Sequence, residues 1–228
     1  MIRPALVLLP GVGADHRLFR RQQTAFANLV VPPWLTAARG ETFESYADRM
    51  ALHIRAILPA GVPVVLGGAS MGGMLAVQMA PMLRPRVLVL LGSCLHPREI
   101  TAVGRAAGRT ARLVGPSGVE RLRALAPAAV HSLGPMTRAQ RRELLEMTDA
   151  LPAEFLVWAA RAIFRWNGAP RPRCRLLRVH GSLDRIITPP TTPIDLLLAR
   201  AGHVPSVTHA DQVNQVIADA LQLAAADA

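Results

Sequence analysis

The chain has 228 residues, 51% of them apolar, and a formal net charge of +11. This length favours one domain with a large core, and no apolar run approaches the roughly 20 residues of a transmembrane helix. All 26 basic residues are arginines that form no single run, and only one tyrosine is available for base stacking, so we expect no nucleic-acid partner. Between Arg98 and Arg178 there are 15 arginines against 6 acidic residues, which indicates a solvated helical face or, alternatively, a docking surface for an acidic partner.

The two cysteines and the N-terminal residues indicate in which cellular compartment the protein is expected. Cys94 and Cys174 stand far apart in the sequence, and a secreted chain of this size would not depend on them, so we expect two reduced thiols. The apolar residues 5–9 are too short for a signal peptide, and no cleavage site follows them. We therefore expect a cytoplasmic protein without stable membrane insertion.

The first ninety residues predict alternating strands and helices. A continuous apolar run such as residues 5–9 is typical of a parallel strand that is buried on both faces. The alternation predicts right-handed crossovers and a parallel sheet. The expected strands are residues 5–9, 28–31, 62–66 and 86–91, and the expected helices are residues 15–27, a segment that begins at Thr42 and ends before Pro59, and residues 71–83.

From about residue 101 to residue 169 this alternation stops. The segment contains no β-branched run, and its last part places Phe155, Trp158, Ala162 and Trp166 on one apolar helical face. We interpret it as a helical insertion over the sheet edge, within a single domain of residues 1–228. The helices expected in it are residues 105–114, 118–125, 137–150 and 152–166. After it we expect strands at residues 174–179 and 194–199, and a last helix with Thr208 as its N-cap.

The clearest chemical signal is Gly68-Ala69-Ser70-Met71-Gly72, which fits the pattern G-x-S-x-G between an expected strand and an expected helix. To present its hydroxyl above a sheet, Ser70 must adopt a strained backbone conformation. The glycines two positions before and after it let the helix fold back close to the strand. The alternative is a glycine-rich turn with a bystander serine. We predict that Ser70 is a nucleophile.

A serine nucleophile needs a base, and the base needs an acidic group that orients it. Asp184 and His203 each follow the end of an expected strand, where ligand-facing loops gather in parallel sheets. Asp184 could instead be a turn residue paired with Arg185, and Asp195 is the alternative acid. The other histidines have weaker contexts, and His180 is expected to pack in the core. These others are His16, His53, His96, His131, His180 and His209.

An oxyanion hole needs two amide donors near the nucleophile. We predict the backbone N–H of Met71, which follows the serine, and that of Val12, in the loop after the first strand. Gly11 and Gly13 would give this loop its conformational freedom, although the alternative is an ordinary glycine-rich turn. Gly11-x-Gly13 lacks the third glycine of a dinucleotide-binding fingerprint, and no metal or organic cofactor is implied.

These motifs together resemble the α/β-hydrolase family, specifically the small bacterial serine hydrolases that open with a Pro-Gly-x-Gly-Ala-Asp loop. The similarity rests on residues 9–15, 68–73, 180–185 and 202–205, so it covers nearly the whole chain. It implies an α/β-hydrolase fold, with a mostly parallel sheet flanked by helices. It also implies a triad of Ser70, His203 and Asp184, and a lid formed by the helical insertion.

Three features depart from that pattern. Pro10 stands where many relatives have a histidine. The chain begins at the strand that carries the oxyanion loop, so we expect the fold's usual first hairpin to be missing. Only 19 positions separate Asp184 from His203, which leaves little room for a helix between their strands.

The resemblance implies a carboxylesterase that acts on a small or medium apolar ester. The aromatic residues of the insertion are the expected substrate-binding residues, namely Phe155, Trp158 and Trp166. Two alternatives remain open, a thioesterase that acts on carrier-bound acyl groups and a non-catalytic ligand-binding module.

Overall fold

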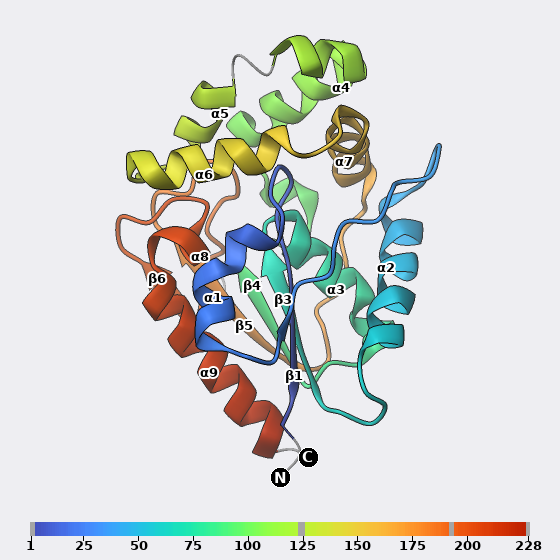
Figure 1. Cartoon of the computed structure of the whole chain (residues 1–228), viewed down its shortest axis with the longest axis vertical. Coiled ribbons are helices and arrows are strands. Elements are labelled where there is room, and N and C mark those ends of the chain that lie inside the picture. Colours follow the sequence, from blue (N-terminus) through green and yellow to red (C-terminus); the bar gives the residue numbers. More distant parts are fainter. Residues whose placement is uncertain (1–2, 123–125, 192–193, 227–228) are drawn as a thin grey trace.

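A computed structural model describes residues 3–122, 126–191 and 194–226 (Figure 1). Within these ranges six strands form one sheet in the spatial order β2-β1-β3-β4-β5-β6, and every neighbouring pair is parallel. The predicted parallel sheet is therefore confirmed. The strands are β1 (Ala5–Leu9), β2 (Leu29–Val30), β3 (Val64–Ala69), β4 (Val87–Leu91), β5 (Arg175–Gly181) and β6 (Leu196–Leu198).

Helices cover both faces of the sheet, with α1 and α9 on one face and α2 and α3 on the other (Figure 1). Side chains alternate along a strand, so Leu6 and Leu8 of β1 pack in the core on the α9 side, while Val7 and Leu9 pack against α2 and α3. Burial on both faces explains why β1 and β4 are apolar without interruption. The covering helices are α1 (Arg20–Ala25), α2 (Phe43–Ile57), α3 (Met71–Leu83) and α9 (Ala210–Ala226).

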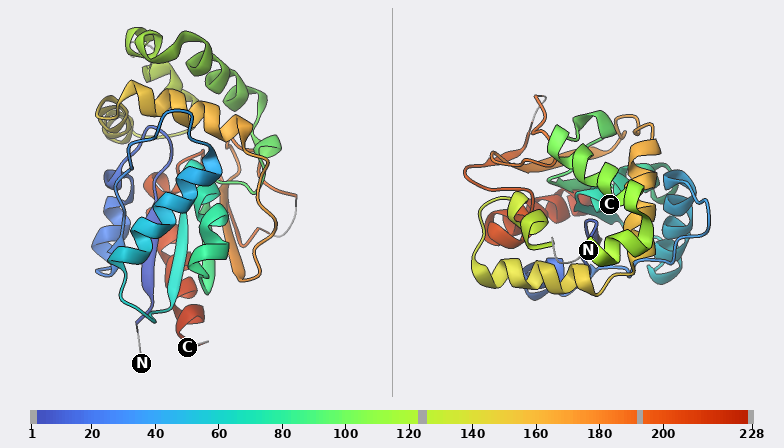
Figure 2. Two further views of the ribbon diagram at one scale, coloured as in Figure 1. Left: turned by 90° about the vertical axis from the view of Figure 1, so that its right-hand side faces the viewer. Right: turned by 90° about the horizontal axis from the view of Figure 1, so that it is seen from above.

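The helical insertion lies over one end of the sheet, at the carboxyl ends of the strands, while both chain termini lie near the opposite end (Figures 1 and 2). Seen from above, its helices lie across the top of the molecule, over the end of the sheet (Figure 2). Its helices are α4 (Ala102–Leu122), α5 (Ala126–Ser132), α6 (Arg138–Asp149) and α7 (Ala153–Arg165).

The break predicted in the first part of the insertion is present. The residues of α4 form two helical segments on either side of Gly115, whose φ of 65° and ψ of −175° are not helical, within the expected gap between residues 114 and 118. Pro116 follows the break and cannot donate an intrahelical hydrogen bond. The expected end at residue 125 lies outside the described residues, and the structure adds α5, which the sequence did not predict.

Helix starts were predicted with mixed success. Thr42 does cap α2, because its hydroxyl accepts a hydrogen bond from Ser45 N at 3.1 Å in a capping box. The prediction that Thr208 caps the last helix is wrong. Pro205 starts a separate short helix, α8 (Pro205–Thr208), and the Thr208 hydroxyl donates to Val204 O at 3.2 Å. Helix α9 then begins at Ala210.

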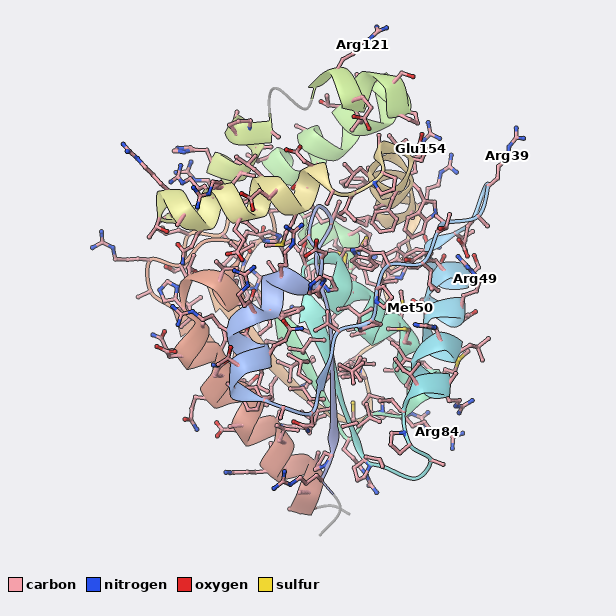
Figure 3. The ribbon with its side chains drawn as sticks, in the orientation of Figure 1. Arg39, Arg49, Met50, Arg84, Arg121 and Glu154 are labelled. Carbon is pink, nitrogen blue, oxygen red and sulfur yellow. The ribbon has the colours of Figure 1, made fainter. Side chains whose placement is uncertain are left out.

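Short segments complete the fold. Two 3-10 helices occur, η1 (His16–Phe19) after β1 and η2 (Pro97–Glu99) after β4. As the spacing predicted, no helix lies between β5 and β6 among the residues that are described. In that same part of the chain, no helix combines the length and apolar character needed to span a bilayer. Arg39 and Arg121 extend away from the body of the molecule (Figure 3).

Candidate active site

The sharp turn between β3 and α3 holds Ser70 at φ 51° and ψ −120°, a region that non-glycine residues rarely adopt. The predicted backbone strain is therefore confirmed. A Cβ at Gly68 would lie 2.5 Å from the Gly72 carbonyl carbon, and one at Gly72 would lie 2.1 Å from Leu9 O. Both positions thus require glycine, because α3 starts directly against β1 and β3.

Hydrogen bonds from β4 and the loop after it hold this turn in place. Ser70 N–H donates to Leu91 O at 3.1 Å, and the buried Ser93 hydroxyl donates to Ser70 O at 2.7 Å. A Cβ at Gly73 would lie 2.5 Å from Ser93 Oγ, so the third glycine of the stretch leaves room for this hydroxyl. The sequence analysis did not identify Ser93, since a serine after an apolar strand has no distinctive pattern.

The structure brings Ser70, His203 and Asp184 together, as predicted. His203 Nε2 lies 2.9 Å from Ser70 Oγ, and His203 Nδ1 lies 2.8 Å from Asp184 Oδ2. His203 is 5% exposed and the Asp184 side chain is fully buried, whereas Ser70 is partly exposed. The arrangement therefore runs from a buried carboxylate through a buried imidazole to a partly exposed serine.

The Asp184 carboxylate accepts three hydrogen bonds and is in close contact with a second histidine. Oδ1 accepts from Ile186 N at 2.8 Å and Ile187 N at 3.0 Å, and Oδ2 faces His203 Nδ1 and His180 Nε2, the latter at 3.0 Å. Burial opposes the charge of Asp184. The charge of His203 and the hydrogen bonds from the two histidines and Ile187 nevertheless hold the pKa of this carboxyl well below its usual range.

The alternative acids and bases are placed elsewhere. Asp195 accepts hydrogen bonds from Arg178 N at 2.8 Å and Arg175 at 3.2 Å, so it braces β5. His209 Nδ1 lies 2.9 Å from Thr208 Oγ1, between α8 and α9, and it is His203 that reaches Ser70. His180 is 1% exposed, as expected of a core residue, but its contact with Asp184 was not predicted.

The loop after β1 packs against Ser70. A turn is closed by the hydrogen bond from Ala14 N to Gly11 O at 3.1 Å, and Gly13 within it has φ 80°. A Cβ at Gly11 would lie 3.2 Å from Ser70 Cβ. Met71 is the first residue of α3, where backbone N–H groups have no intrahelical acceptor. Both predicted amide donors, those of Val12 and Met71, therefore belong to segments that adjoin Ser70.

Two contacts from the insertion support these loops, and neither was predicted. The Thr148 hydroxyl of α6 lies 2.9 Å from Gly13 O in the loop after β1. His203 N donates to Leu133 O, between α5 and α6, at 2.7 Å. Such contacts depend on how the insertion folds over the sheet, and no local sequence pattern indicates them.

The sequence comparison decides the family. A model of the alpha/beta hydrolase family matches residues 6–216. The chain belongs to the α/β-hydrolase family. A comparison with curated proteins gave no significant match.

Solved α/β-hydrolase structures superpose on nearly the whole chain. A thermophilic esterase from Thermogutta terrifontis has a TM-score of 0.76 at 21% identity, covering 97% of this chain and 90% of that one. The enol-lactonase from Burkholderia xenovorans LB400 has a TM-score of 0.77 at 18% identity, with coverages of 96% and 92%. A 2-hydroxy-6-oxo-6-phenylhexa-2,4-dienoate hydrolase from Rhodococcus sp. strain RHA1 has a TM-score of 0.72 at 19% identity, with coverages of 96% and 91%. At these identities the likeness establishes the fold, and the substrate must be argued from the site.

A cavity of about 800 Å³ lies between the loop at residues 31–41 and α7 of this α/β-hydrolase. Phe155 and Trp158 line it together with Trp34, and Phe155 is 5.2 Å from Trp34 and 5.5 Å from Trp158 between ring centroids. Pro10, which precedes the glycine packed against Ser70, is in the lining, whereas Ser70 is not. Two of the three aromatic residues expected to bind substrate therefore face an open space.

The prediction for Trp166 is wrong. This residue is 2% exposed, its ring centroid lies 5.0 Å from that of Phe43, and its Nε1 donates to Gln78 Oε1 at 2.9 Å. It follows the end of α7, where the chain descends to the core around α2 and α3. Some apolar residues of this segment thus line the cavity and others pack in the core. Helical spacing alone could not show which residues do which.

The structure also shows the state of the two cysteines and the arrangement of potential metal ligands. Cys94 and Cys174 are free, and burial raises the pKa of the Cys94 thiol far above its usual range, so this thiol stays protonated. In the described ranges, no group of three or more His, Cys, Asp and Glu side chains is arranged to hold a metal ion.

Proposed function

We propose that this α/β-hydrolase is a serine esterase that cleaves carboxylic esters through an acyl-enzyme. Ser70 is the nucleophile, His203 the general base and Asp184 the group that orients the base. The observation that carries the proposal is the chain of two hydrogen bonds, 2.9 Å from Ser70 Oγ to His203 Nε2 and 2.8 Å from His203 Nδ1 to Asp184 Oδ2.

In the first half of the reaction, His203 Nε2 takes the Ser70 proton as Oγ attacks the ester carbonyl carbon. The imidazolium that forms is stabilised by the ionised Asp184, and the low pKa of this carboxyl keeps it ionised at neutral pH. The N–H groups of Met71 and Val12 stabilise the negative oxygen of the tetrahedral intermediate. His203 then gives its Nε2 proton to the departing alkoxide, which leaves as the alcohol.

In the second half, water replaces the alcohol. His203 Nε2 takes one proton from this water while the oxygen attacks the acyl carbon. The second tetrahedral intermediate collapses, and Ser70 Oγ recovers its proton from His203 as the carboxylic acid leaves. The cycle consumes one water and returns every group to its starting protonation state.

The aromatic cavity supports an apolar substrate. Phe155 and Trp158 would pack against the acyl or alcohol part of a small or medium ester, with Trp34 beside them. The helical insertion of residues 101–169 would serve as the lid of a single domain that spans residues 1–228. We propose a cytoplasmic enzyme, and the esterase and lactonase names of two structural relatives are consistent with ester chemistry.

Hydrolysis of matched substrates tests this proposal. We expect the wild-type chain to hydrolyse p-nitrophenyl acetate and p-nitrophenyl butyrate, with a lower KM for the butyrate. Trp158→Ala should raise the KM for the butyrate. A thioester of the same acyl group separates the esterase from the thioesterase, since the esterase should prefer the oxygen ester. Absence of turnover on every ester would contradict the proposal and favour a ligand-binding module.

A further inference from the structure

We propose that His180 is a positioning residue that fixes the Asp184 carboxylate for His203, an inference that rests on the proposed esterase function. His180 Nε2 lies 3.0 Å from Asp184 Oδ2, the same oxygen that lies 2.8 Å from His203 Nδ1. One carboxylate oxygen thus joins two imidazoles, of which one reaches Ser70 and the other does not.

The protonation of His180 follows from its neighbours. Its Nε2 faces Asp184 Oδ2 and also Ile187 O, at 3.1 Å. Both of these atoms are acceptors, so Nε2 must carry a proton, and we infer that the Ile187 carbonyl and the Asp184 carboxylate share it. A hydrogen bond from an N–H to a carboxylate is charge-assisted, and it is stronger where water is excluded. His180 is 1% exposed and the Asp184 side chain is fully buried, so water is excluded here.

The contact between His180 and Asp184 can hold the carboxylate in place because His180 belongs to a strand and not to the loop of Asp184. Asp184 Oδ1 is held by the amides of Ile186 and Ile187, which belong to the same loop as Asp184. Oδ2 has only histidine partners among these contacts, and His203 itself changes charge during the reaction. His180 instead belongs to β5, pairs with Leu197 of β6, and keeps Oδ2 aligned while His203 gains and loses its proton.

Other charged groups near His180 are already paired. Arg178 lies two residues earlier on the same face of β5, is 6% exposed, and reaches Glu99 Oε2 at 3.2 Å. Glu99 Oε1 in turn accepts from His96 N at 2.9 Å. Among the residues that the structure describes, the ionisable groups that contact the Asp184 carboxylate are His180 and His203, so a change at His180 acts on the carboxylate directly.

Two variants separate positioning from simple core packing. His180→Phe keeps an aromatic ring and removes the donor, while His180→Gln places an amide N–H where it can reach Asp184. Val179→Ala is the matched control, because it removes buried side-chain volume from the next position of β5 on the other sheet face. Each variant is measured by thermal unfolding, by kcat and KM on p-nitrophenyl butyrate, and by the low-field ¹H NMR spectrum, in which protons in short imidazole–carboxylate hydrogen bonds appear.

We expect His180→Phe to lower kcat by about tenfold with little change in KM, since a charge-assisted hydrogen bond is lost and substrate contacts are not. The His180 proton resonance should disappear and that of His203 Nδ1–H should move. His180→Gln should recover most of kcat and the His203 resonance. Val179→Ala should lower the unfolding temperature without changing kcat or that resonance.

Folded His180→Phe with wild-type kcat and an unmoved His203 resonance would overturn the inference. Equal losses in His180→Phe and His180→Gln would also overturn it, because they would show a packing role. Failure of the proposed function can be told apart from failure of this inference. If the wild-type chain hydrolyses no ester, the proposed function fails, but the NMR spectra of the variants still show whether the His203 resonance depends on His180.

Discussion

Two helices of the insertion, α6 and the far half of α4, are held in different ways. Helix α6 buries Leu144 and Met147 in the core on the α9 side of the sheet. Its Thr148 contacts Gly13 O, and its Gln140 donates to Val207 O in α8 at 3.1 Å. Helix α6 is thus attached to the loop beside Ser70 and to the segment that follows His203.

Helix α4 is fastened at its start. The Thr101 hydroxyl, just before it, donates to Arg185 O, and a Cβ at Gly104 would lie 2.8 Å from Ile186 O. Beyond that, Leu113 is 84% exposed, and a Cβ at Gly115 would meet nothing within 4 Å. The difference teaches that the insertion has two parts. The wall, α6, contacts the loop beside Ser70, and the outer arm, the half of α4 from Arg109 onward, makes none of these contacts, although its Pro116 lines the cavity.

The largest expected effect is at Ser70, next to the loop that the wall contacts. Ser70→Ala should lower kcat on p-nitrophenyl butyrate by about four orders of magnitude or more, because the nucleophile is lost. The unfolding temperature should stay close to wild type. Ser70→Val should in addition unfold at lower temperature, since a β-branched residue is costly at φ 51°. Equal unfolding temperatures for the two variants would show that the turn is not strained.

Substitution of His203 and of His209 should have very different effects on kcat. His203→Ala should lower kcat by at least about a thousandfold, because in the part of the chain that the structure describes no other side chain hydrogen-bonds to Ser70 Oγ to take its proton. His209→Ala should keep most activity, since its ring contacts Thr208 and not the serine. Steady-state kinetics of the two variants checks this, and a reversed outcome would refute the assignment of the base.

A matched pair of threonines tests the wall against the outer arm directly. Thr148 of α6 and Thr110 of α4 each bond the carbonyl four residues earlier, at 2.9 and 3.1 Å, but only Thr148 also contacts Gly13 O. Thr148→Val should lower kcat/KM by about fivefold, the weight of one neutral hydrogen bond. Thr110→Val should leave it unchanged. Equal effects on kcat/KM would remove the distinction between the two helices.

The smallest expected effect concerns Asp15, at the end of the loop beside the nucleophile. Burial opposes its charge, but hydrogen bonds from Arg17, at 2.7 Å for the shorter side-chain contact, hold the pKa of Asp15 below its usual value. Arg17 also reaches Glu146 O of α6 at 3.3 Å. A carboxyl whose pKa is depressed on folding contributes stability above its unfolded pKa of about 3.9, and this contribution is lost as the pH falls through the folded pKa.

Asp15→Asn should therefore lower the free energy of unfolding by about 0.5 kcal/mol at neutral pH, and the difference from wild type should shrink below about pH 4. Urea unfolding at pH 7 and at pH 3 measures it. Asp219→Asn on the exposed face of α9, where the carboxylate accepts from Gln215, is the control that should show a smaller effect. A difference that grows in acid would contradict the role of the charge.

The sequence predicted the sheet, the serine turn and the three residues of the proposed triad, which the structure places in contact, for identifiable reasons. Buried strands must be apolar, and a turn as tight as that around Ser70 requires glycine at fixed positions, so both leave local patterns. His180, Ser93 and Thr148 act through contacts between segments distant along the chain or through unremarkable residue types, which leave no such pattern. Trp166 was misassigned because helical spacing shows an apolar face and does not show what covers it.

The most direct test of the central claim, that Ser70 is the nucleophile, is covalent labelling. The wild-type chain is treated with a fluorophosphonate, which reacts with activated serines, and the modified residue is identified by peptide mass spectrometry. We predict one label on Ser70 that is absent from the Ser70→Ala and His203→Ala variants, while the buried Ser93 stays unmodified. Label on any other residue, or no label on the folded wild-type chain, would contradict the account.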